Sequence, residues 1–279
     1  MSSLDRELTE VLRISEIATK RVMEIYATDF VVEEKSPEDP VTRADREAND
    51  IITTELARAF PDAAIVAEES APKDTEELAK ALANERVFFV DPVDGTREFA
   101  NRNGEFAVMI GLAIGGRTAL GVVSVPVEGH VYFGRVGQGA FRADGFAGVD
   151  AATALHVTKV SNPKEARAVV SRSHRSRELE PVLARLGITN EVSVGSVGLK
   201  VARVVTGAAD IYVHPNRGAK KWDSCAPSAI LEAAGGSFTD VDGNAIDYRA
   251  PSLDLARGIA ATNGVLHPAV VAACRGAMR

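Results

Sequence analysis

Apolar and polar positions follow helical spacing through most of the first quarter of the chain. Apolar residues recur at this spacing over residues 4–28, with charged residues between them, which predicts an amphipathic helix. The polar stretch 33–40 contains two prolines and predicts a mobile loop. Helical spacing returns over residues 42–60, with Thr42 as the expected N-cap. A short, charged helix is expected at residues 74–83.

Spacing typical of strands dominates the following region. Short apolar runs at 64–67 and 87–90 predict two buried strands. The second should stop pairing at Pro92, which has no N–H group to donate. Longer apolar runs separated by glycine-containing turns predict an antiparallel sheet, and they span residues 107–114, 120–125 and 131–135. The first half is therefore expected to be α+β.

The second half alternates strands with helices. Residues 142–166 are irregular and are the best place for a boundary, so we divide the chain into halves 1–145 and 146–279. The expected strands lie at 168–170, 191–194, 210–213, 237–241 and 258–261. The expected helices lie at 176–186, 196–207, 223–234 and from 268 onward. This alternation predicts a second sheet that is covered by helices, in a mixed α/β half.

The overall charge narrows the classes of function. The formal net charge is −7 at pH 7, which argues against a protein that binds nucleic-acid polymers or attaches to a membrane through basic residues. An anionic small substrate remains compatible, because bound cations reverse the local field. No apolar run is long enough to span a membrane, and no signal peptide is recognisable. The two cysteines, Cys225 and Cys274, form no metal or disulfide pattern, so we expect the reducing cytoplasm.

One segment joins a strand end, two acids and a helix start that follows a glycine. After the apolar run 87–90 the chain reads Asp91-Pro92-Val93-Asp94-Gly95-Thr96. Carboxylate oxygens suit Mg²⁺, N–H groups at a helix start accept phosphate, and glycine lets the backbone approach a ligand closely. The segment therefore predicts a divalent cation and a phosphate bound together. The alternative is an ordinary turn in which the acids act as caps.

Acidic residues also stand at the ends of several other predicted elements. Each has an ordinary interpretation by itself: Asp45 suits the first turn of a helix, Asp223 suits an N-cap, and Glu69 suits a solvated surface. Together the acids favour a shared metal site, because ligand sites in layered α/β folds collect at strand ends. The five acids of this predicted site are Asp45, Glu68, Asp91, Asp94 and Asp223.

These motifs resemble those of a known family. Residues 91–96, and Trp222-Asp223 followed after eleven residues by two glycines, resemble the two signatures of the inositol monophosphatase-like superfamily. Residues 40–45 and 68–70 resemble its two other conserved blocks. The resemblance implies a Mg²⁺-dependent, lithium-sensitive phosphomonoesterase. It also implies a layered α-β-α-β-α sandwich of the α+β class, with an antiparallel sheet in the first half and a mixed α/β second half.

The resemblance implies roles for individual residues as well. The implied ligands of two or three Mg²⁺ ions are Glu68, Asp91, the Val93 carbonyl, Asp94 and Asp223. Thr96 and Asp45 would accept the proton of the attacking water, with Glu68 as the third catalytic residue. The N–H groups of Gly95 and Thr96 would bind the scissile phosphate.

Further stretches are similar to the bacterial 3′(2′),5′-bisphosphate nucleotidases of this superfamily. They are residues 96–106, 169–174 and 195–200. They make His174, Ser196, Lys200 and Arg172 candidates for binding the nucleotide end of the substrate, with a surface or capping role as the ordinary alternative for each. Inositol-specific members usually carry an acid before the Trp-Asp motif to hold sugar hydroxyls. This chain has the basic run 217–221 there, which suits a second substrate phosphate.

The expected reaction is hydrolysis of the 3′(2′)-phosphate of adenosine 3′,5′-bisphosphate, or of its sulfated form, by metal-activated water. The alternative is an inositol-1-phosphate or other sugar monophosphatase with the same catalytic core. A non-catalytic protein that kept the fold should have lost some of the acids, and none is missing. The expected partner is a small phosphorylated substrate rather than a nucleic-acid polymer or a membrane, and a homodimer remains open.

Overall fold

The structure is a computed structural model that describes residues 3–36 and 39–277. A seven-stranded sheet forms its first half, in the order β3-β4-β5-β6-β7-β8-β9. Strand β3 is parallel to β4, and every later neighbour pair is antiparallel. The predicted antiparallel sheet is thus confirmed. The strands are β3 (Ala64–Ala67), β4 (Arg86–Asp94), β5 (Ala107–Ile114), β6 (Arg117–Val125), β7 (His130–Arg135), β8 (Gly139–Asp144) and β9 (Thr153–Leu155).

Two long helices cover the outer face of this sheet. Helix α1 (Ser3–Tyr26) and helix α2 (Arg43–Ala59) pack on each other and on the strands. Their periodic apolar residues, such as Val11, Ile14 and Ile52, are fully buried in one core with residues of β4 and β5. Burial of apolar area holds the helices on the sheet. The short helix α3 (Thr75–Ala83) lies beside β3.

The second half contains a five-stranded mixed sheet in the order β11-β10-β12-β14-β13. Strand β10 is parallel to both β11 and β12, whereas β14 is antiparallel to β12 and β13. The prediction of a mixed second half is confirmed. The strands are β10 (Arg167–Ser171), β11 (Asn190–Val194), β12 (Ile211–His214), β13 (Ser237–Thr239) and β14 (Ile259–Thr262).

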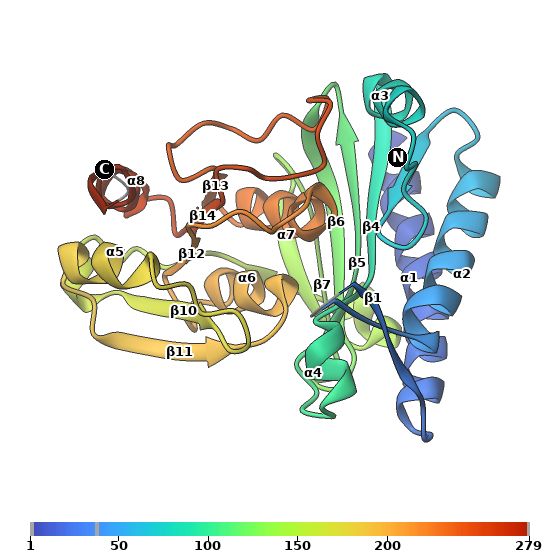
Figure 1. Cartoon of the computed structure of the whole chain (residues 1–279), viewed down its shortest axis with the longest axis horizontal. Coiled ribbons are helices and arrows are strands. Elements are labelled where there is room, and N and C mark those ends of the chain that lie inside the picture. Colours follow the sequence, from blue (N-terminus) through green and yellow to red (C-terminus); the bar gives the residue numbers. More distant parts are fainter. Residues whose placement is uncertain (1–2, 37–38, 278–279) are drawn as a thin grey trace.

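The helices of the second half form two layers. Helix α6 (Val197–Val205) and helix α7 (Lys221–Ala233) lie between the two sheets and share one apolar core with both. Helix α5 (Leu179–Leu186) and helix α8 (His267–Ala277) cover the far face of the second sheet. Figure 1 shows the resulting order of layers, from α1 and α2 at one side to α5 and α8 at the other. The predicted α-β-α-β-α sandwich is therefore confirmed.

The first sheet continues beyond the predicted division of the chain. Strand β9 follows a 3₁₀ helix (Phe146–Ala151) and pairs with β8, so the chain leaves this sheet only after Leu155. The division at residue 145 stays a prediction. A second 3₁₀ helix, Pro163–Glu165, leads into β10. No helix in the described residues is long and apolar enough to cross a membrane.

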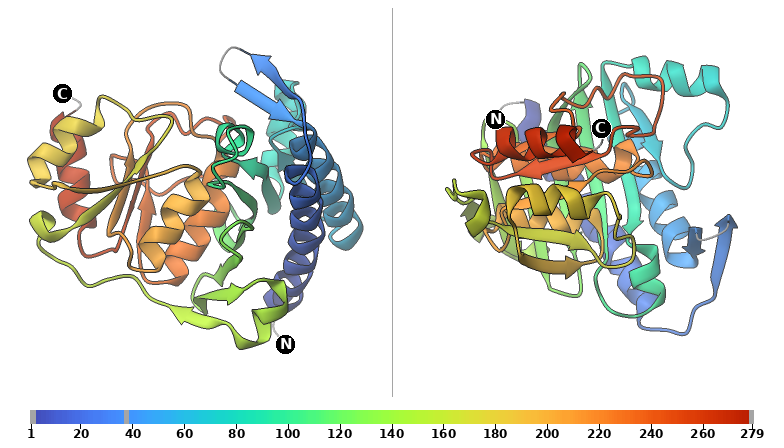
Figure 2. Two further views of the ribbon diagram at one scale, coloured as in Figure 1. Left: turned by 90° about the horizontal axis from the view of Figure 1, so that it is seen from below. Right: turned by 60° about the vertical axis from the view of Figure 1, so that its left-hand side comes forward.

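The stretch 33–40, which we predicted to be a loop, is an antiparallel hairpin wherever it is described. Strand β1 (Val32–Ser36) pairs with β2 (Asp39–Thr42), and Pro37 and Glu38 lie outside the described residues. The loop prediction failed because ion pairs to distant elements, rather than an apolar face, bind this hairpin. Glu33, for example, accepts two hydrogen bonds from Arg46 of α2. Figure 2 shows the hairpin projecting beside α2.

Candidate active site

The carboxyl end of β4 places Asp91 and Asp94 inside the molecule, with exposed fractions of 2% and 7%. Asp91 is opposite Met109 of β5 and Asp94 is opposite Ala107. Between these two pairs β4 advances by three residues and β5 by only two, so β4 contains one extra residue. This β-bulge accommodates Pro92 within the strand. Our prediction that pairing ends at Pro92 is therefore wrong. The bulge turns both carboxylates toward the same interior region.

A left-handed glycine connects β4 to the short helix α4 (Thr96–Ala100). Gly95 has a φ angle of 93°, which a residue with a side chain adopts only with strain. Thr96 then begins α4, and its hydroxyl lies 3.0 Å from Asp45 Oδ1 and 3.1 Å from the Val93 carbonyl oxygen. The turn thus joins residues 93–96 to an acid on a different helix.

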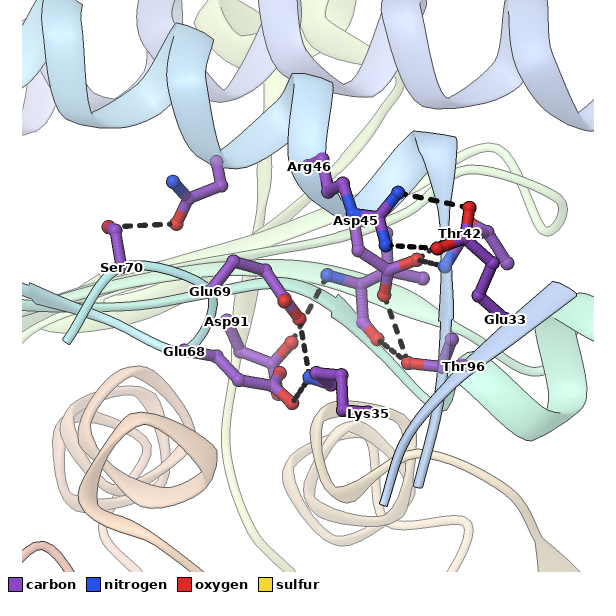
Figure 3. A network of polar contacts seen from close by, with 12 residues as sticks. Glu33, Lys35, Thr42, Asp45, Arg46, Glu68, Glu69, Ser70, Asp91 and Thr96 are labelled. Atoms are coloured by element: carbon purple, nitrogen blue, oxygen red, sulfur yellow. Dashed lines mark hydrogen bonds and ion pairs between the residues drawn. The ribbon is translucent and has the colours of Figure 1, made fainter. Parts of the chain in front are cut away.

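Asp45 has a structural role and a position in the site at the same time. Its Oδ2 atom accepts the N–H and the hydroxyl of Thr42, over 2.7 Å and 2.6 Å, which forms the predicted cap of α2. Its Oδ1 atom accepts the Thr96 hydroxyl, as Figure 3 shows. Burial raises the pKa of Asp45, and the Thr42 hydrogen bonds oppose this rise. A carboxylate with a raised pKa is a stronger base once it is ionised.

Glu68 and Glu69 follow β3 and meet a lysine that our sequence analysis missed. Lys35 of the hairpin lies 2.9 Å from Glu68 Oε1 and 2.6 Å from Glu69 Oε1 (Figure 3). The Glu69 side chain is only 7% exposed, so its ordinary interpretation as a solvated residue is wrong. No local pattern pointed to Lys35, because its contacts depend on the tertiary position of the hairpin.

The remaining predicted ligand, Asp223, enters from α7. Its Oδ2 atom accepts the Lys220 N–H over 2.7 Å, which stabilises the start of that helix. Burial, and next the charge of Asp94, raise the pKa of Asp223 to about 8. Burial likewise raises the pKa of Glu68 to about 7, against the opposing effect of Lys35. Burial and the charges of the surrounding acids, Glu68 first, raise the pKa of Asp91 well above its usual range.

These acids fit a hard divalent cation in their chemistry. All are oxygen donors, as Mg²⁺ requires, and their mutual repulsion favours proton uptake or a bound cation. Over residues 3–36 and 39–277, no group of three or more His, Cys, Asp or Glu side chains already has an arrangement that could hold a metal ion. The assignment of Glu68, Asp91, Asp94, Asp223 and the Val93 carbonyl as Mg²⁺ ligands therefore stays a prediction.

A cleft of about 550 Å³ is lined by residues of both halves; of the predicted acids it contains Asp94 and Asp223, but not Asp45, Glu68 or Asp91. Asp94, Gly95, Thr96 and Asp223 line one part of it, and the candidates His174, Ser196 and Lys200 line another. The structure thus brings the substrate-binding candidates Gly95, Thr96, His174, Ser196 and Lys200, from three separate stretches of the chain, into one cavity.

Ser196 and Lys200 are anchored beside the acids by helix α6. The Ser196 hydroxyl donates to Asp94 Oδ2 and accepts the Leu199 N–H, so it also caps the helix. Lys200 is 4% exposed, and its ammonium lies 5.3 Å from the centre of the Tyr212 ring. Burial lowers the pKa of Lys200. A buried cation beside an aromatic face is poorly hydrated and interacts strongly with an anion.

Comparison with known proteins assigns the chain to a family. The model of the inositol monophosphatase family matches residues 5–279. A 3′(2′),5′-bisphosphate nucleotidase CysQ from Salmonella typhimurium is 34% identical over 244 residues, which are 86% of this chain and 93% of the relative. The chain belongs to the inositol monophosphatase family. It is a phosphoric monoester hydrolase, and further relatives of the same kind reach into mammals.

One such relative is the rat 3′(2′),5′-bisphosphate nucleotidase 1, which is 32% identical over 249 residues, 78% of this chain and 77% of the relative. Among solved structures, CysQ from Bacteroides thetaiotaomicron matches with a TM-score of 0.79 and 27% identity, over 92% of this chain and 97% of the other. An inositol monophosphatase from Anabaena matches with a TM-score of 0.77 and 25% identity, over 99% and 97%.

Some basic residues that we assigned to the substrate of this family member do not line the cleft. Arg172 instead forms two hydrogen bonds with the Glu105 carboxylate, 2.6 Å and 2.7 Å long. Lys220 pairs with Asp254. The buried ammonium of Lys221 donates to the carbonyl oxygens of Tyr248 and Ala250, so it is structural. Of the three basic residues in the run 217–221, Arg217 is the one that lines the cavity.

The cleft also contains charged and polar residues that sequence reasoning missed. They include Arg175 and Tyr212, and also Arg97, Glu98, His214 and Asn216, which lie in stretches that the sequence analysis considered but to which it gave no individual role. Burial, and then the charge of Lys200, lower the pKa of His214 to about 4, so this imidazole is neutral at physiological pH. Glu98 and Arg97 directly follow Thr96, and their position next to the motif is the signal that would have found them.

Proposed function

We propose that this phosphatase removes the 3′(2′)-phosphate of adenosine 3′,5′-bisphosphate, or of its sulfated form, by Mg²⁺-assisted attack of water. The observation that supports this most is the shared cleft, in which Asp94, Thr96 and Asp223 lie in the same cavity as Lys200. One part suits the scissile phosphate and the other suits a second anionic group. The names of the nucleotidase relatives point to the same substrate class.

The acids and Thr96 would act on the scissile phosphate. Glu68, Asp91, Asp94, Asp223 and the Val93 carbonyl would hold two or three Mg²⁺ ions, which neutralise phosphate charge and acidify water. Asp45 would accept the proton of the attacking water through the Thr96 hydroxyl, since those two groups are already 3.0 Å apart. The N–H groups of Gly95 and Thr96, at the start of α4, would bind the phosphate oxygens.

Ser196, Lys200 and His174 would bind the second phosphate through charge-assisted hydrogen bonds. Arg217 can contribute from the rim of the same cavity. The stretch before Trp222, where inositol-specific members usually carry an acid, contains none, and the polar residues that it adds to the cleft are His214, Asn216 and Arg217. Hydrolysis of inositol 1-phosphate would use the same acids and Thr96, so it is the second candidate. The reducing cytoplasm, a homodimer and lithium inhibition remain predictions of the same proposal.

Phosphate release at equal enzyme and Mg²⁺ concentrations compares the two substrates. We expect kcat/KM for adenosine 3′,5′-bisphosphate to exceed that for inositol 1-phosphate at least about tenfold, equivalent to roughly 1.4 kcal/mol. Lys200→Ala should remove much of this preference but spare a small monophosphate, because it removes binding remote from the reacting atoms. Lys220→Ala is the matched control, since Lys220 pairs with Asp254 instead of lining the cleft. Equal or better turnover of inositol 1-phosphate would refute the nucleotidase proposal.

A further inference from the structure

Glu98 is a buried acid in the cleft for which the proposed reaction has no use. Its exposed fraction is 3%, and it lines the same cavity as Thr96 and Lys200. It is neither one of the expected metal ligands nor the expected base. A carboxylate near a phosphate site repels the substrate, so its presence calls for another role.

The side chain of Glu98 connects the two halves of the molecule. Its Oε1 atom accepts the hydroxyl of Ser173, in the segment that follows β10 of the second sheet. Its aliphatic part lies directly on Gly195, where an added Cβ would be 2.4 Å from Glu98 Cγ. No larger residue fits at position 195 unless Glu98 moves. Glu98 thus contacts both segments of the second half that carry the candidates for binding the second phosphate.

The contact with Gly195 precedes a strained residue. Ser196 has a φ angle of 46°, which lies in the left-handed region and is costly for a residue with a side chain. This conformation lets the Ser196 hydroxyl reach Asp94 and cap α6, which carries Lys200. The Gly198 N–H also donates to Asp94 Oδ2, over 2.7 Å. Surrounding contacts must hold such a strained turn in place.

We propose that Glu98 is a positioning residue that holds the Gly195–Ser196 turn and Ser173 against α4. Through that contact it keeps Ser196 and Lys200 at a fixed distance from the scissile-phosphate site and so sets the affinity for a substrate with a second phosphate. The substrate part rests on the proposed function. The role depends on the shape and the acceptor oxygen of Glu98 rather than on its charge, because its partners are a hydroxyl and a glycine.

Three variants separate shape from charge. Glu98→Gln keeps an acceptor oxygen and nearly the same volume, Glu98→Ala removes both, and Ser173→Ala removes only the donor. The matched control is Glu128→Ala. Glu128 of the first half pairs with Arg203 of α6 outside the cleft, so this variant breaks a different contact between the halves and leaves Glu98 in place.

The first test compares the KM of each variant for two substrates, one with a second phosphate and one without. Glu98→Ala should raise KM for adenosine 3′,5′-bisphosphate about tenfold, while KM for the small ester p-nitrophenyl phosphate changes less than about threefold, because the lost binding is remote from the reacting phosphate. Glu98→Gln and Glu128→Ala should stay near the wild type, and Ser173→Ala should change in the same direction as Glu98→Ala, by less. Equal KM changes for both substrates, or a Gln variant as impaired as the Ala variant, would overturn the proposal. If Glu98→Ala does not fold, an unchanged KM in Ser173→Ala overturns it.

Amide hydrogen exchange provides the second test, and it needs no substrate. The N–H groups of Gly198 and Leu199 should exchange faster in Glu98→Ala than in the wild type or in Glu128→Ala. The first donates to Asp94 Oδ2 and the second to the Ser196 hydroxyl, and both bonds depend on the position of the turn that Glu98 supports. Unchanged exchange contradicts the positioning role. If the wild type fails to hydrolyse the bisphosphate but exchange responds as expected, the proposed substrate is wrong and the positioning role stands.

Discussion

The ammonium group of Lys35 lies 2.9 Å from Glu68 Oε1, so a cation of the chain itself neutralises part of the acidic group. Lys35 also contacts Glu69, 2.6 Å away, and it reaches both acids from the hairpin formed by β1 and β2. Glu68 is one of the residues expected to hold Mg²⁺. The ammonium and a metal ion would therefore compete for the same carboxylate.

Replacement of Lys35 by Met should expose this competition. Without metal, Lys35→Met should have a lower Tm than the wild type, because Glu68 and Glu69 lose their counter-charge. It should gain more in Tm on addition of Mg²⁺, and the Mg²⁺ concentration for half-maximal activity should fall a few-fold, by linkage of metal binding to the folded state. Lys73→Met, at an exposed position, is the control. An unchanged Mg²⁺ requirement would mean that Lys35 and the metal do not compete.

Asp91→Asn should abolish turnover and leave the fold intact. Asp91 is buried and feels the charges of nearby acids, Glu68 first, so the amide removes repulsion as well as an expected ligand. Thermal unfolding without metal should therefore show an unchanged or higher Tm, while stabilisation by Mg²⁺ should shrink. Activity near that of the wild type at saturating Mg²⁺ would remove Asp91 from the site.

The raised pKa values predict the pH dependence of stability without metal. Glu68 and Asp223 have folded-state pKa values of about 7 and about 8, above the roughly 4 expected when unfolded. The folded state therefore binds more protons than the unfolded state between about pH 4 and these folded-state pKa values. Stability falls as pH rises across this range, and the fall ends once pH has passed 7 for Glu68 and 8 for Asp223. Mg²⁺ should weaken this fall, because it binds the ionised acids. Tm measured from pH 5 to pH 9, with EDTA or Mg²⁺, tests this, and Asp223→Asn should flatten the upper part of the EDTA curve.

Asp45 and Thr96 should behave as one unit in catalysis. Asp45→Asn and Thr96→Ala should each lower kcat by about 10²-fold or more, with little change in KM, as expected for a general base. The double variant should lose less than the product of the two single losses. Multiplicative losses would mean that the two groups act independently.

Asp45 also caps α2, and Thr42→Val separates that role from catalysis. This variant removes the capping hydroxyl but keeps the contact between Asp45 and Thr96. It should cost about 1 kcal/mol of stability, as a lost N-cap does. Its kcat at a temperature well below Tm should stay within a few-fold of the wild type, which is far less than the loss expected for a general base. A loss as large as that of Asp45→Asn would indicate that the hydroxyl, or the cap itself, takes part in catalysis.

The sequence by itself determined the layers and the acidic core. Periodic burial decides whether a segment becomes a helix or a strand, and this information is local. The segment Asp91 to Thr96 is local in the same sense for its glycine turn and helix start, which the sequence predicts, whereas the bulge at Pro92 became visible only in the pairing with β5. The cap formed by Thr42 and Asp45 was predictable for that reason too.

Only the tertiary structure decided which charges meet. Lys35, in a polar stretch that we predicted to be a loop, contacts acids over thirty residues away in the chain. Lys221, in a basic run that we assigned to a substrate phosphate, instead donates hydrogen bonds to two backbone carbonyl oxygens. Glu98 and Gly195 fit together although nothing near either residue in the chain indicates the other. Electrostatic and close packing contacts depend on distances between elements, and those distances follow from how the layers stack rather than from the spacing of residues along the chain.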